Sequence, residues 1–173
     1  MQVSCRKAQR FRGDVAHEAT ALKVLIIFLS LFASGLLVGN ELAVAVFIHP
    51  VLYSISDEAH VREAKPLARR LGRSMPFWYA LSLVFAILQM LIARAASVAW
   101  CLCCAAAILL ALIIVLTILL PAPINHQIAR WNLDQLATNW LSMRRRWDLY
   151  HRVRVLLLMV MLVLLILSAL LDP

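Results

Sequence analysis

Four long apolar runs occupy most of this 173-residue chain and constrain its fold more than any other feature. They cover residues 24–48, 75–93, 99–120 and 155–171. Each run is close to or above the roughly 20 residues that an α-helix needs to cross the hydrocarbon core of a bilayer. Lipid offers the backbone no hydrogen-bond partners, so single-chain runs of this length form helices. The sequence therefore predicts an all-α fold, a four-helix transmembrane bundle.

The composition supports one membrane-embedded domain. Hydrophobic residues make up 64% of the chain and the mean hydropathy is +0.86, which exceeds what a soluble domain carries. No linker rich in Gly, Ser or Pro divides the sequence, so we expect a basic N-terminal tail over 1–21 and a single four-helix domain over 22–173. The first apolar stretch continues through Ile48, past the length of a signal peptide. The expected location is the plasma or inner membrane, in a multi-pass arrangement.

The charge distribution points to lipid as a partner. The formal net charge is +8, but the basic residues are confined to short segments beside the apolar runs, where they normally meet lipid headgroups. We therefore expect contact with membrane lipid and no nucleic acid. Segments 49–74 and 121–154 share one side of the membrane and carry the larger positive charge, which predicts that they are cytoplasmic and that both termini lie opposite. The basic N-terminal tail opposes this orientation.

Polar residues interrupt the end of the first apolar run. Asn40 and Glu41 precede seven apolar residues, and a carboxylate facing lipid there would cost roughly 2.5 kcal/mol or more. Glu41 is therefore expected to face the bundle interior, either at a functional site or in a structural ion pair with the fourth span. His49 precedes Pro50 and lies about 12 Å along and about 80° around a regular helix from Glu41. A substrate of aromatic size would reach both side chains.

The segment 121–154 carries the densest set of polar and aromatic residues. Ile124, Ile128 and Trp131 recur at helical spacing and predict a short interfacial helix between the third and fourth spans. Further on, five residues share one helical stripe: Trp140, Arg144, Trp147, His151 and Arg154. The stripe leads into the apolar seam of the fourth span, so we interpret it as an inward, site-forming face. The alternative is an interfacial belt, with Trp at headgroup depth and Arg on phosphates.

Several smaller patterns indicate caps and packing contacts. Ser74 is expected to cap the second span, and Trp78 and Tyr79 to lie at headgroup level. The small residues from Gly35 to Gly39 predict close packing against another helix. The three cysteines at 101, 103 and 104 cannot all point at one metal ion, because a helix turns about 100° per residue. We interpret them as small, buried apolar residues.

A resemblance to a known family appears at these residues. The strings Pro123-Ile124-Asn125 and Arg130-Trp131-Asn132, then Trp140 and the run 144–151, resemble the signature of the anthrone oxygenase-like family of small membrane proteins. Gly39-Asn40-Glu41 and His49-Pro50 are similar to that family's opening, so the match covers nearly all of the chain after residue 20. The chain departs from the family pattern at 133–138, where prolines are expected. Membership implies a four-helix membrane protein, and the best-known activity of some members is oxygenation of an anthrone to an anthraquinone.

The chemistry of such a reaction assigns candidate roles. An anthrone has an acidic methylene between two aryl rings, and a base that removes its proton leaves an anion that reacts with O₂ without a metal. His151 is the candidate base, because imidazole titrates near neutral pH, and either Asp148 or Glu41 would orient it. We expect His49, Trp147, His151 and Arg154 to line one pocket beneath 121–138, with Glu41, the second catalytic candidate, at its floor. The candidate substrate-binding residues are Asn40, His49, Asn125, His126, Trp140, Arg144, Trp147 and Arg154, with the tryptophans stacking on flat rings and the arginines facing the enolate oxygen.

Other functions are compatible with the same residues. His49, His126 and His151 would also suit haem or a metal ion, which the sequence neither supports nor excludes. A non-enzymatic carrier or accessory subunit would use Glu41, His151 and the arginines as a structural ion-pair network. A proton-coupled carrier is disfavoured, because residues 156–167 contain no ionisable side chain. The favoured function is a membrane-embedded monooxygenase-type enzyme acting on a flat aromatic substrate, anthrone- or phenol-like. A cofactor beyond O₂ and a homo-oligomeric state are left open.

Overall fold

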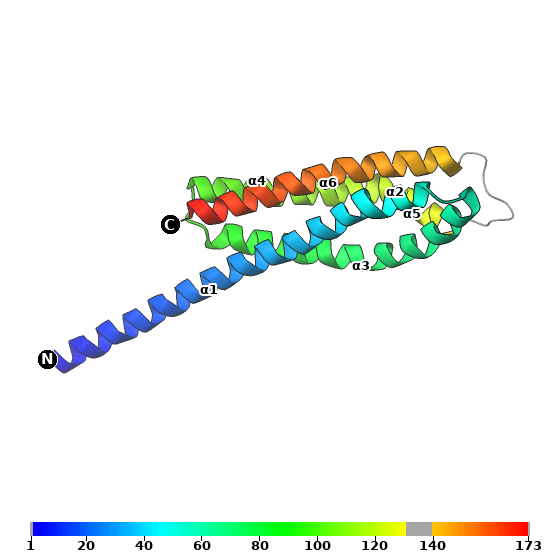
Figure 1. The fold of residues 1–173 in the computed structure, drawn as a ribbon. Coiled ribbons are helices and arrows are strands. Elements are labelled where there is room, and N and C mark those ends of the chain that lie inside the picture. Colours follow the sequence, from blue (N-terminus) through cyan, green and yellow to red (C-terminus); the bar gives the residue numbers. More distant parts are fainter. Residues whose placement is uncertain (1, 131–139, 173) are drawn as a thin grey trace.

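The structure, a computed structural model, describes residues 2–130 and 140–172, with side chains from residue 14 onward. The described part is helical, apart from short turns (Figure 1). In chain order its elements are α1 (Gln2–Ala43), the π-helix η1 (Val44–Ile48), α2 (His49–Tyr53), α3 (Asp57–Ile92), α4 (Val98–Leu119), α5 (Pro121–Ile128) and α6 (Trp140–Leu171).

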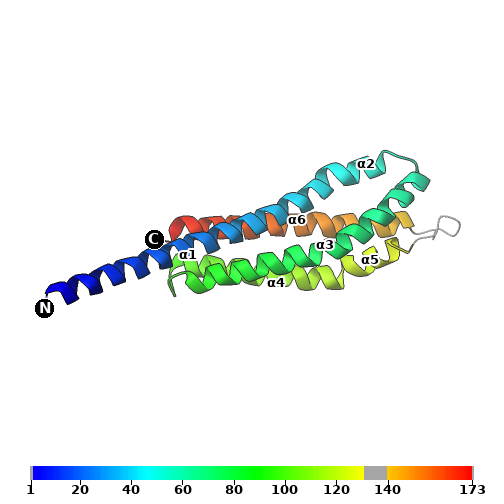
Figure 2. The same cartoon turned by 90° about the horizontal axis from the view of Figure 1, so that it is seen from below.

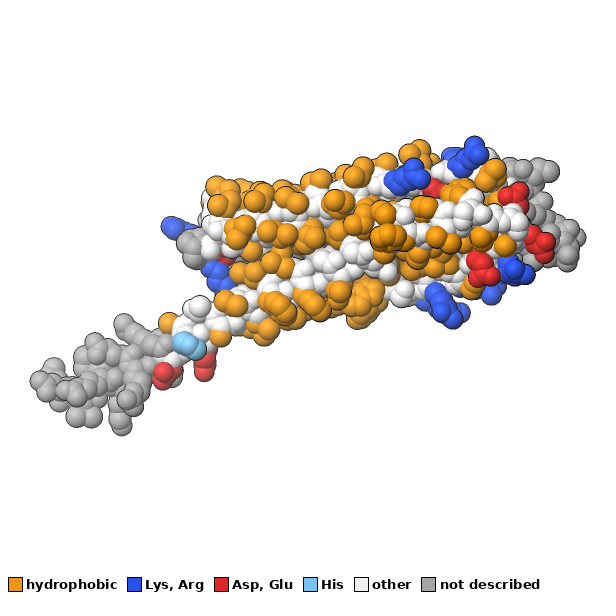
Figure 3. Space-filling model, viewed as in Figure 1, with side chains coloured by type: hydrophobic (Ala, Val, Ile, Leu, Met, Phe, Trp, Pro, Cys, Tyr) orange, Lys and Arg blue, Asp and Glu red, His pale blue; other side chains and the backbone are white. Residues whose placement is uncertain are grey.

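Four of these stretches are long and apolar enough to cross a membrane: Asp14–Tyr53, Asp57–Ile92, Val98–Leu119 and Trp140–Leu171. The all-α fold with four candidate spans is confirmed, as is a short helix, α5, between the third and fourth spans. Figure 3 shows hydrophobic side chains over the middle of one face, with charged side chains mostly toward the two ends. The chain is therefore a membrane protein whose polar groups gather at the ends of the helices.

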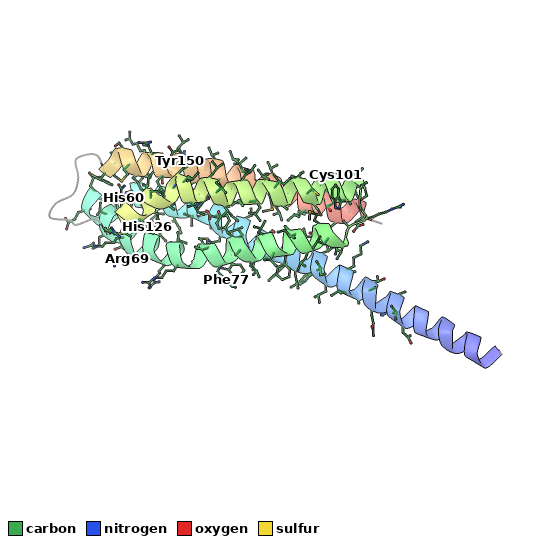
Figure 4. All side chains as sticks on the ribbon, turned by 180° about the vertical axis from the view of Figure 1, so that it is seen from behind. His60, Arg69, Phe77, Cys101, His126 and Tyr150 are labelled. Carbon is green, nitrogen blue, oxygen red and sulfur yellow. The ribbon has the colours of Figure 1, made fainter. Side chains whose placement is uncertain are left out.

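The helices form an elongated bundle. Helices α4 and α6 lie side by side, α3 packs against α1 and α4, and α1 crosses the bundle obliquely (Figures 1 and 2). The two chain ends lie toward one end of the bundle. Helices α2 and α5 and the first turns of α3 and α6 lie at the opposite end, called the polar end below. Figure 4 places His60 and His126 at the polar end and Cys101 at the other.

The core has two parts. The larger lies between the spans and includes Leu37, Leu110, Leu158 and Met161, all fully buried. The smaller lies at the polar end and includes Val61, Ile128 and the rings of Trp140 and Trp147. Lipid tails are as apolar as Leu, so close van der Waals packing holds such helices together rather than exclusion of water. The second core fixes α5 and the start of α6 against α3.

The spans begin earlier than their apolar runs. Helix α3 starts at Asp57 rather than near residue 75, and its N-cap is Ser56, whose hydroxyl accepts a hydrogen bond from the backbone N–H of Ala59 at 3.4 Å. The prediction that Ser74 caps this helix is wrong: Ser74 lies within α3 and donates to the carbonyl of Arg70 at 3.1 Å. The polar stretch before it stays helical because one face of it is apolar and buried in the second core.

The packing prediction for the first span has a different outcome. The close approach expected at Gly35 and Gly39 is wrong for this chain, because a Cβ at either position would meet nothing within 4 Å. In the second span, Gln89 faces a neighbouring helix, and its Nε2 donates to the carbonyl of Leu165 at 3.2 Å. Three features of the sequence lie outside the described residues: Trp131 and Asn132, the departure from the family pattern at 133–138, and the side chains before residue 14.

Candidate functional site

A π-helix sets the phase of the polar residues at the end of the first span. Each turn of η1 takes in one extra residue, which offsets the helix beyond it by about 100°. The separation of about 80° expected between Glu41 and His49 on a regular helix therefore falls to about 20°. Both side chains are buried, at 2% and 1% exposure. In a regular α-helix the ring of Pro50 would clash with the carbonyl of Val46, and η1 contains that carbonyl.

Glu41 lies at the centre of a buried cluster from three helices. Arg154 Nη2 donates to Glu41 Oε2 at 2.8 Å, and His151 Nδ1 lies 3.2 Å from the same oxygen. Tyr79 Oη donates to the other carboxylate oxygen at 2.9 Å. The expectation that Glu41 faces the interior and meets a basic side chain of the fourth span is confirmed. We call Glu41, Tyr79, His151 and Arg154 the Glu41 cluster.

The contacts of His151 indicate which ring nitrogen can accept a proton. Its Nε2 lies 3.1 Å from the backbone carbonyl oxygen of Glu41. A carbonyl oxygen only accepts, so Nε2 carries the hydrogen and the lone pair of the neutral ring is on Nδ1. Nδ1 lies 2.8 Å from Arg154 Nη2. Of the two orienting partners considered from the sequence, Glu41 is the one in contact with His151, and Asp148 pairs elsewhere.

Asp148 forms a second cluster of the same composition. Its Oδ2 accepts a hydrogen bond from Tyr53 Oη, and its Oδ1 lies 3.3 Å from both His49 Nδ1 and Arg144 Nε. We call Tyr53, His49, Arg144 and Asp148 the Asp148 cluster; its members come from α2 and α6. Each cluster thus combines one carboxylate, one Tyr, one His and one Arg.

Aromatic contacts join the two clusters. The rings of His49 and His151 have centroids 5.0 Å apart. Trp147 stacks on His151 at 5.0 Å and meets His49 edge-on at 5.0 Å, while the Arg144 guanidinium lies 4.7 Å from the Trp147 ring. The stripe predicted for α6 is inward-facing: Trp140, Arg144, Trp147 and His151 are each at most 9% exposed. The interfacial-belt alternative does not describe these side chains.

A cavity of about 210 Å³ adjoins the Glu41 cluster. Most of the predicted site residues line it: Asn40, Glu41, Asn125, His126, Trp147, His151 and Arg154. His49, Trp140 and Arg144 do not. They lie behind Trp147, in or beside the Asp148 cluster. The expected placement of His49 on the pocket wall is therefore wrong, because η1 and α2 direct it into the contact with α6.

Helix α5 closes the cavity on one side. Asn125 Nδ2 donates to the carbonyl of Ala68 at 3.1 Å, which fixes α5 to α3. Gly72 permits this approach, because a Cβ there would lie 3.2 Å from Asn125 Nδ2. His126 is exposed and lines the same side of the cavity. The cavity thus lies between α1, α3, α4 and α6 beneath α5.

Three aromatic or imidazole side chains of the site were not predicted from the sequence. Tyr79, expected at headgroup level, is 5% exposed and contacts Glu41. The spacing of Tyr79, Ser82, Ala86 and Gln89 by 3, 4 and 3 marks an inward face of α3 and was the available signal. Tyr53 and His60 carried no such pattern. His60 is buried between the rings of Tyr53 and Trp140, at 5.1 and 5.4 Å.

The described side chains do not form an evident metal centre. Among the described side chains, those of residues 14–130 and 140–172, no three His, Cys, Asp or Glu are positioned to hold a metal ion. Cys103 Sγ contacts Ser168 Oγ at 2.8 Å, while Cys101 is exposed. What converges at the cavity is a hydrogen-bonded set of acid, base and cation, which is suited to moving a proton and stabilising a negative oxygen.

Comparison with known proteins gives one match. The family model described as anthrone oxygenase matches residues 65–164, from within α3 into α6. That range contains Tyr79, His151 and Arg154 of the Glu41 cluster, together with all of α5. No curated protein and no solved structure matches the chain.

Proposed function

The chain belongs to the anthrone oxygenase family, and on that premise we propose that it is a membrane-embedded enzyme that oxygenates an anthrone- or phenol-like aromatic substrate with O₂. The observation that carries the proposal is the position of the Glu41 cluster on the wall of a cavity. A structural ion pair between two helices needs no adjoining space. A base, its carboxylate partner and a guanidinium beside a cavity are the groups that enolate chemistry requires.

The proton-transfer step uses the two ring nitrogens of His151. Nδ1 takes the proton from the carbon between the substrate's rings, and the electron pair of the broken C–H bond moves onto the substrate oxygen. The Glu41 carboxylate, 3.2 Å away, stabilises the imidazolium that forms. The Arg154 guanidinium stabilises the enolate oxygen. General base catalysis of this kind contributes typically about 10²–10⁴-fold in rate.

The oxidation step balances without a further reductant. The carbanion adds to O₂ and takes up a proton to give a hydroperoxide on the former methylene carbon. Loss of water from that carbon leaves the carbonyl of the quinone. One oxygen atom enters the product and the other leaves as water, and the carbon supplies all four electrons. The role of the protein in this step is to hold the flat ring against Trp147 and Tyr79 and to keep bulk water from the anion.

The orientation of the protein in the membrane is proposed from its basic residues. We place the polar end, with the cavity and α5, at the cytoplasmic face of the plasma or inner membrane, because segments 49–74 and 121–154 carry more positive charge than the opposite loops. A substrate with three fused rings partitions into lipid. A site at the end of the spans then lies within reach of both the bilayer and water.

The test is turnover by the purified protein in lipid nanodiscs. With 1,8-dihydroxyanthrone under air, the expected result is formation of the anthraquinone at a rate well above spontaneous autoxidation in empty nanodiscs. With ¹⁸O₂, one labelled atom should appear in the new carbonyl. Equal rates with and without the protein would reject the proposed activity. An absorption spectrum of the same sample shows directly whether a haem is bound.

A further inference from the structure

A second hollow lies on the outer face of the bundle, between α4 and α6. It has a volume of about 310 Å³, and we call it the outer groove. Its rim consists of Leu116, Leu120, Leu149 and Val153, which are between 40% and 59% exposed and belong to the apolar lengths of the candidate spans or their immediate ends. Tyr150, labelled in Figure 4, also lines it. If the four candidate spans cross the membrane, this hollow faces lipid.

The outer groove and the cavity share three residues. Thr117 of α4, Pro121 of α5 and Arg154 of α6 line both spaces. These side chains are thus the partition between the lipid-facing side and the Glu41 cluster. The cavity alone, at about 210 Å³, is smaller than the roughly 300 Å³ at the lower end of ligand pockets. A ligand of three fused rings needs space on both sides of the partition.

The partition contains two polar atoms without partners. Arg154 Nε and Thr117 Oγ1 are buried, and neither has a hydrogen-bond partner among the side chains that the structure describes, at 14–130 and 140–172. Buried donors are normally paired, because water lost from them must be replaced. An oxygen atom placed at the partition would accept from both the N–H and the hydroxyl.

We propose that the outer groove admits the substrate from the bilayer and binds it first, as a neutral polycyclic ketone or phenol whose oxygen accepts hydrogen bonds from Arg154 Nε and Thr117 Oγ1. Its rings lie against Leu116, Val153 and Leu157. This inference rests on the proposed function, because it supplies the route to the Glu41 cluster. The shared partition means that a short movement of one flexible side chain, that of Arg154, carries the ligand inward.

The charge at the partition argues against a phospholipid as the occupant. Arg154 is paired with the Glu41 carboxylate at 2.8 Å, so the groove offers donors but little uncompensated positive charge for a phosphate. Glu41 and Arg154 together suit a neutral oxygen. When His151 takes the proton, the cluster gains one positive charge, and the guanidinium of Arg154 can then stabilise the enolate oxygen.

The test compares two Val→Trp variants on α6. Val153 lines the groove and is 48% exposed, whereas Val163 is 53% exposed and lies away from it. Binding of radiolabelled 1,8-dihydroxyanthraquinone is measured on the full-length protein in phosphatidylcholine nanodiscs, with empty nanodiscs as the partition blank. Val153→Trp should weaken binding at least 10-fold and Val163→Trp by less than 2-fold, with both variants keeping the wild-type melting temperature.

A second variant tests the oxygen site. Thr117→Val keeps the shape of the side chain and removes its hydroxyl, so it should weaken binding of the dihydroxyanthraquinone about 3- to 10-fold. It should leave binding of anthracene, which has no oxygen, unchanged. Equal loss for both probes would overturn the assignment of Thr117.

Three further results would overturn the groove itself. One is equal affinity in the two Val→Trp variants, and another is no saturable binding of the quinone by the wild type. The third is a phospholipid that native mass spectrometry finds on the wild type and not on Val153→Trp. Binding with the expected variant pattern but without turnover of the anthrone would support the groove and reject the proposed reaction, so the two failures are distinguishable.

Discussion

His49 and His151 meet across the contact between α2 and α6, with ring centroids 5.0 Å apart. Each ring belongs to a different buried cluster, so this contact joins the Glu41 cluster at the cavity to the Asp148 cluster nearer the end of the bundle. The pairing within each cluster explains why so many ionisable groups are tolerated in the buried contact between these helices. Each carboxylate and each guanidinium has an opposite charge within 3.3 Å.

The first prediction concerns the proposed base. His151→Ala should lower anthrone turnover by about 10²-fold or more, because the proton then has no acceptor beside Glu41. Arg145 is exposed and points off the buried stripe, so Arg145→Ala should leave turnover within 2-fold. Both rates are measured in nanodiscs after subtraction of autoxidation. Undiminished turnover in a folded His151→Ala variant would remove His151 from the mechanism.

A second prediction concerns the buried carboxylate. Glu41→Gln leaves the charge of Arg154 buried without its partner, which should cost about 3–5 kcal/mol of unfolding free energy. The matched change is Glu63→Gln, in the exposed pair with Arg62 at 3.7 Å; such surface pairs are worth about 0–1 kcal/mol. Reversible unfolding in mixed micelles measures both. If the two variants lost equal stability, Glu41 would not be the centre of a buried ion pair.

The third prediction uses the tyrosine of each cluster. Tyr79→Phe removes a donor to Glu41 and should cost about 1–3 kcal/mol of stability, together with a fall in turnover, because Tyr79 lines the cavity. Tyr53→Phe removes the corresponding donor to Asp148. It should lower stability while leaving turnover within 2-fold, since Tyr53 is not on the cavity wall. If only Tyr53→Phe lowered turnover, the chemistry would belong to the Asp148 cluster and not to the Glu41 cluster.

The gross fold and much of the site were readable from the sequence for physical reasons. A charged residue in a span must face inward. Residues spaced by 4, 3, 4 and 3 on α6 share one face of the helix, so the whole face must point inward. These two constraints placed Glu41, Trp147, His151 and Arg154 together. They could not place His49, because a single extra residue in η1 changes the phase of everything after it, and only Pro50 hinted at the irregularity.

The start of α3 shows the complementary limit. An apolar-run criterion finds the membrane-crossing part of a helix but not its polar extension, so Ser74 was taken as a cap although Ser56 is the cap. The same criterion treated Tyr79 as an interfacial residue. Tyr79 is buried because it contacts Glu41 of α1, which lies 38 residues earlier in the chain. No pattern in the sequence around Tyr79 reveals a contact with so distant a residue.

The fourth prediction concerns the arrangement across the membrane. With the endogenous cysteines replaced, single cysteines at Ser56 and Asp134 should react with a membrane-impermeant maleimide from the same side. A cysteine at Arg94, in the turn between α3 and α4, should react from the other. Spheroplasts and inverted vesicles provide the two sides. Opposite accessibilities at positions 56 and 134 would contradict four spans.

The last prediction separates a structural role of His49 from a chemical one. His49 Nδ1 lies 3.3 Å from Asp148 Oδ1 in an ion-pair contact, and neither ring nitrogen of His49 has a hydrogen-bond partner among the residues that the structure describes. An Asn side chain keeps a polar N–H group on the side of Asp148 and lacks Nε2, whereas Leu has no polar group. Because His49 lies behind Trp147 and not on the cavity wall, His49→Asn should keep turnover and stability near those of the wild type. His49→Leu should lose about 1–3 kcal/mol of stability, because the buried Asp148 carboxylate then loses a polar neighbour. A stable Asn variant with turnover reduced 100-fold would show instead that Nε2 takes part in the reaction, and the substrate-binding role predicted for His49 from the sequence would stand.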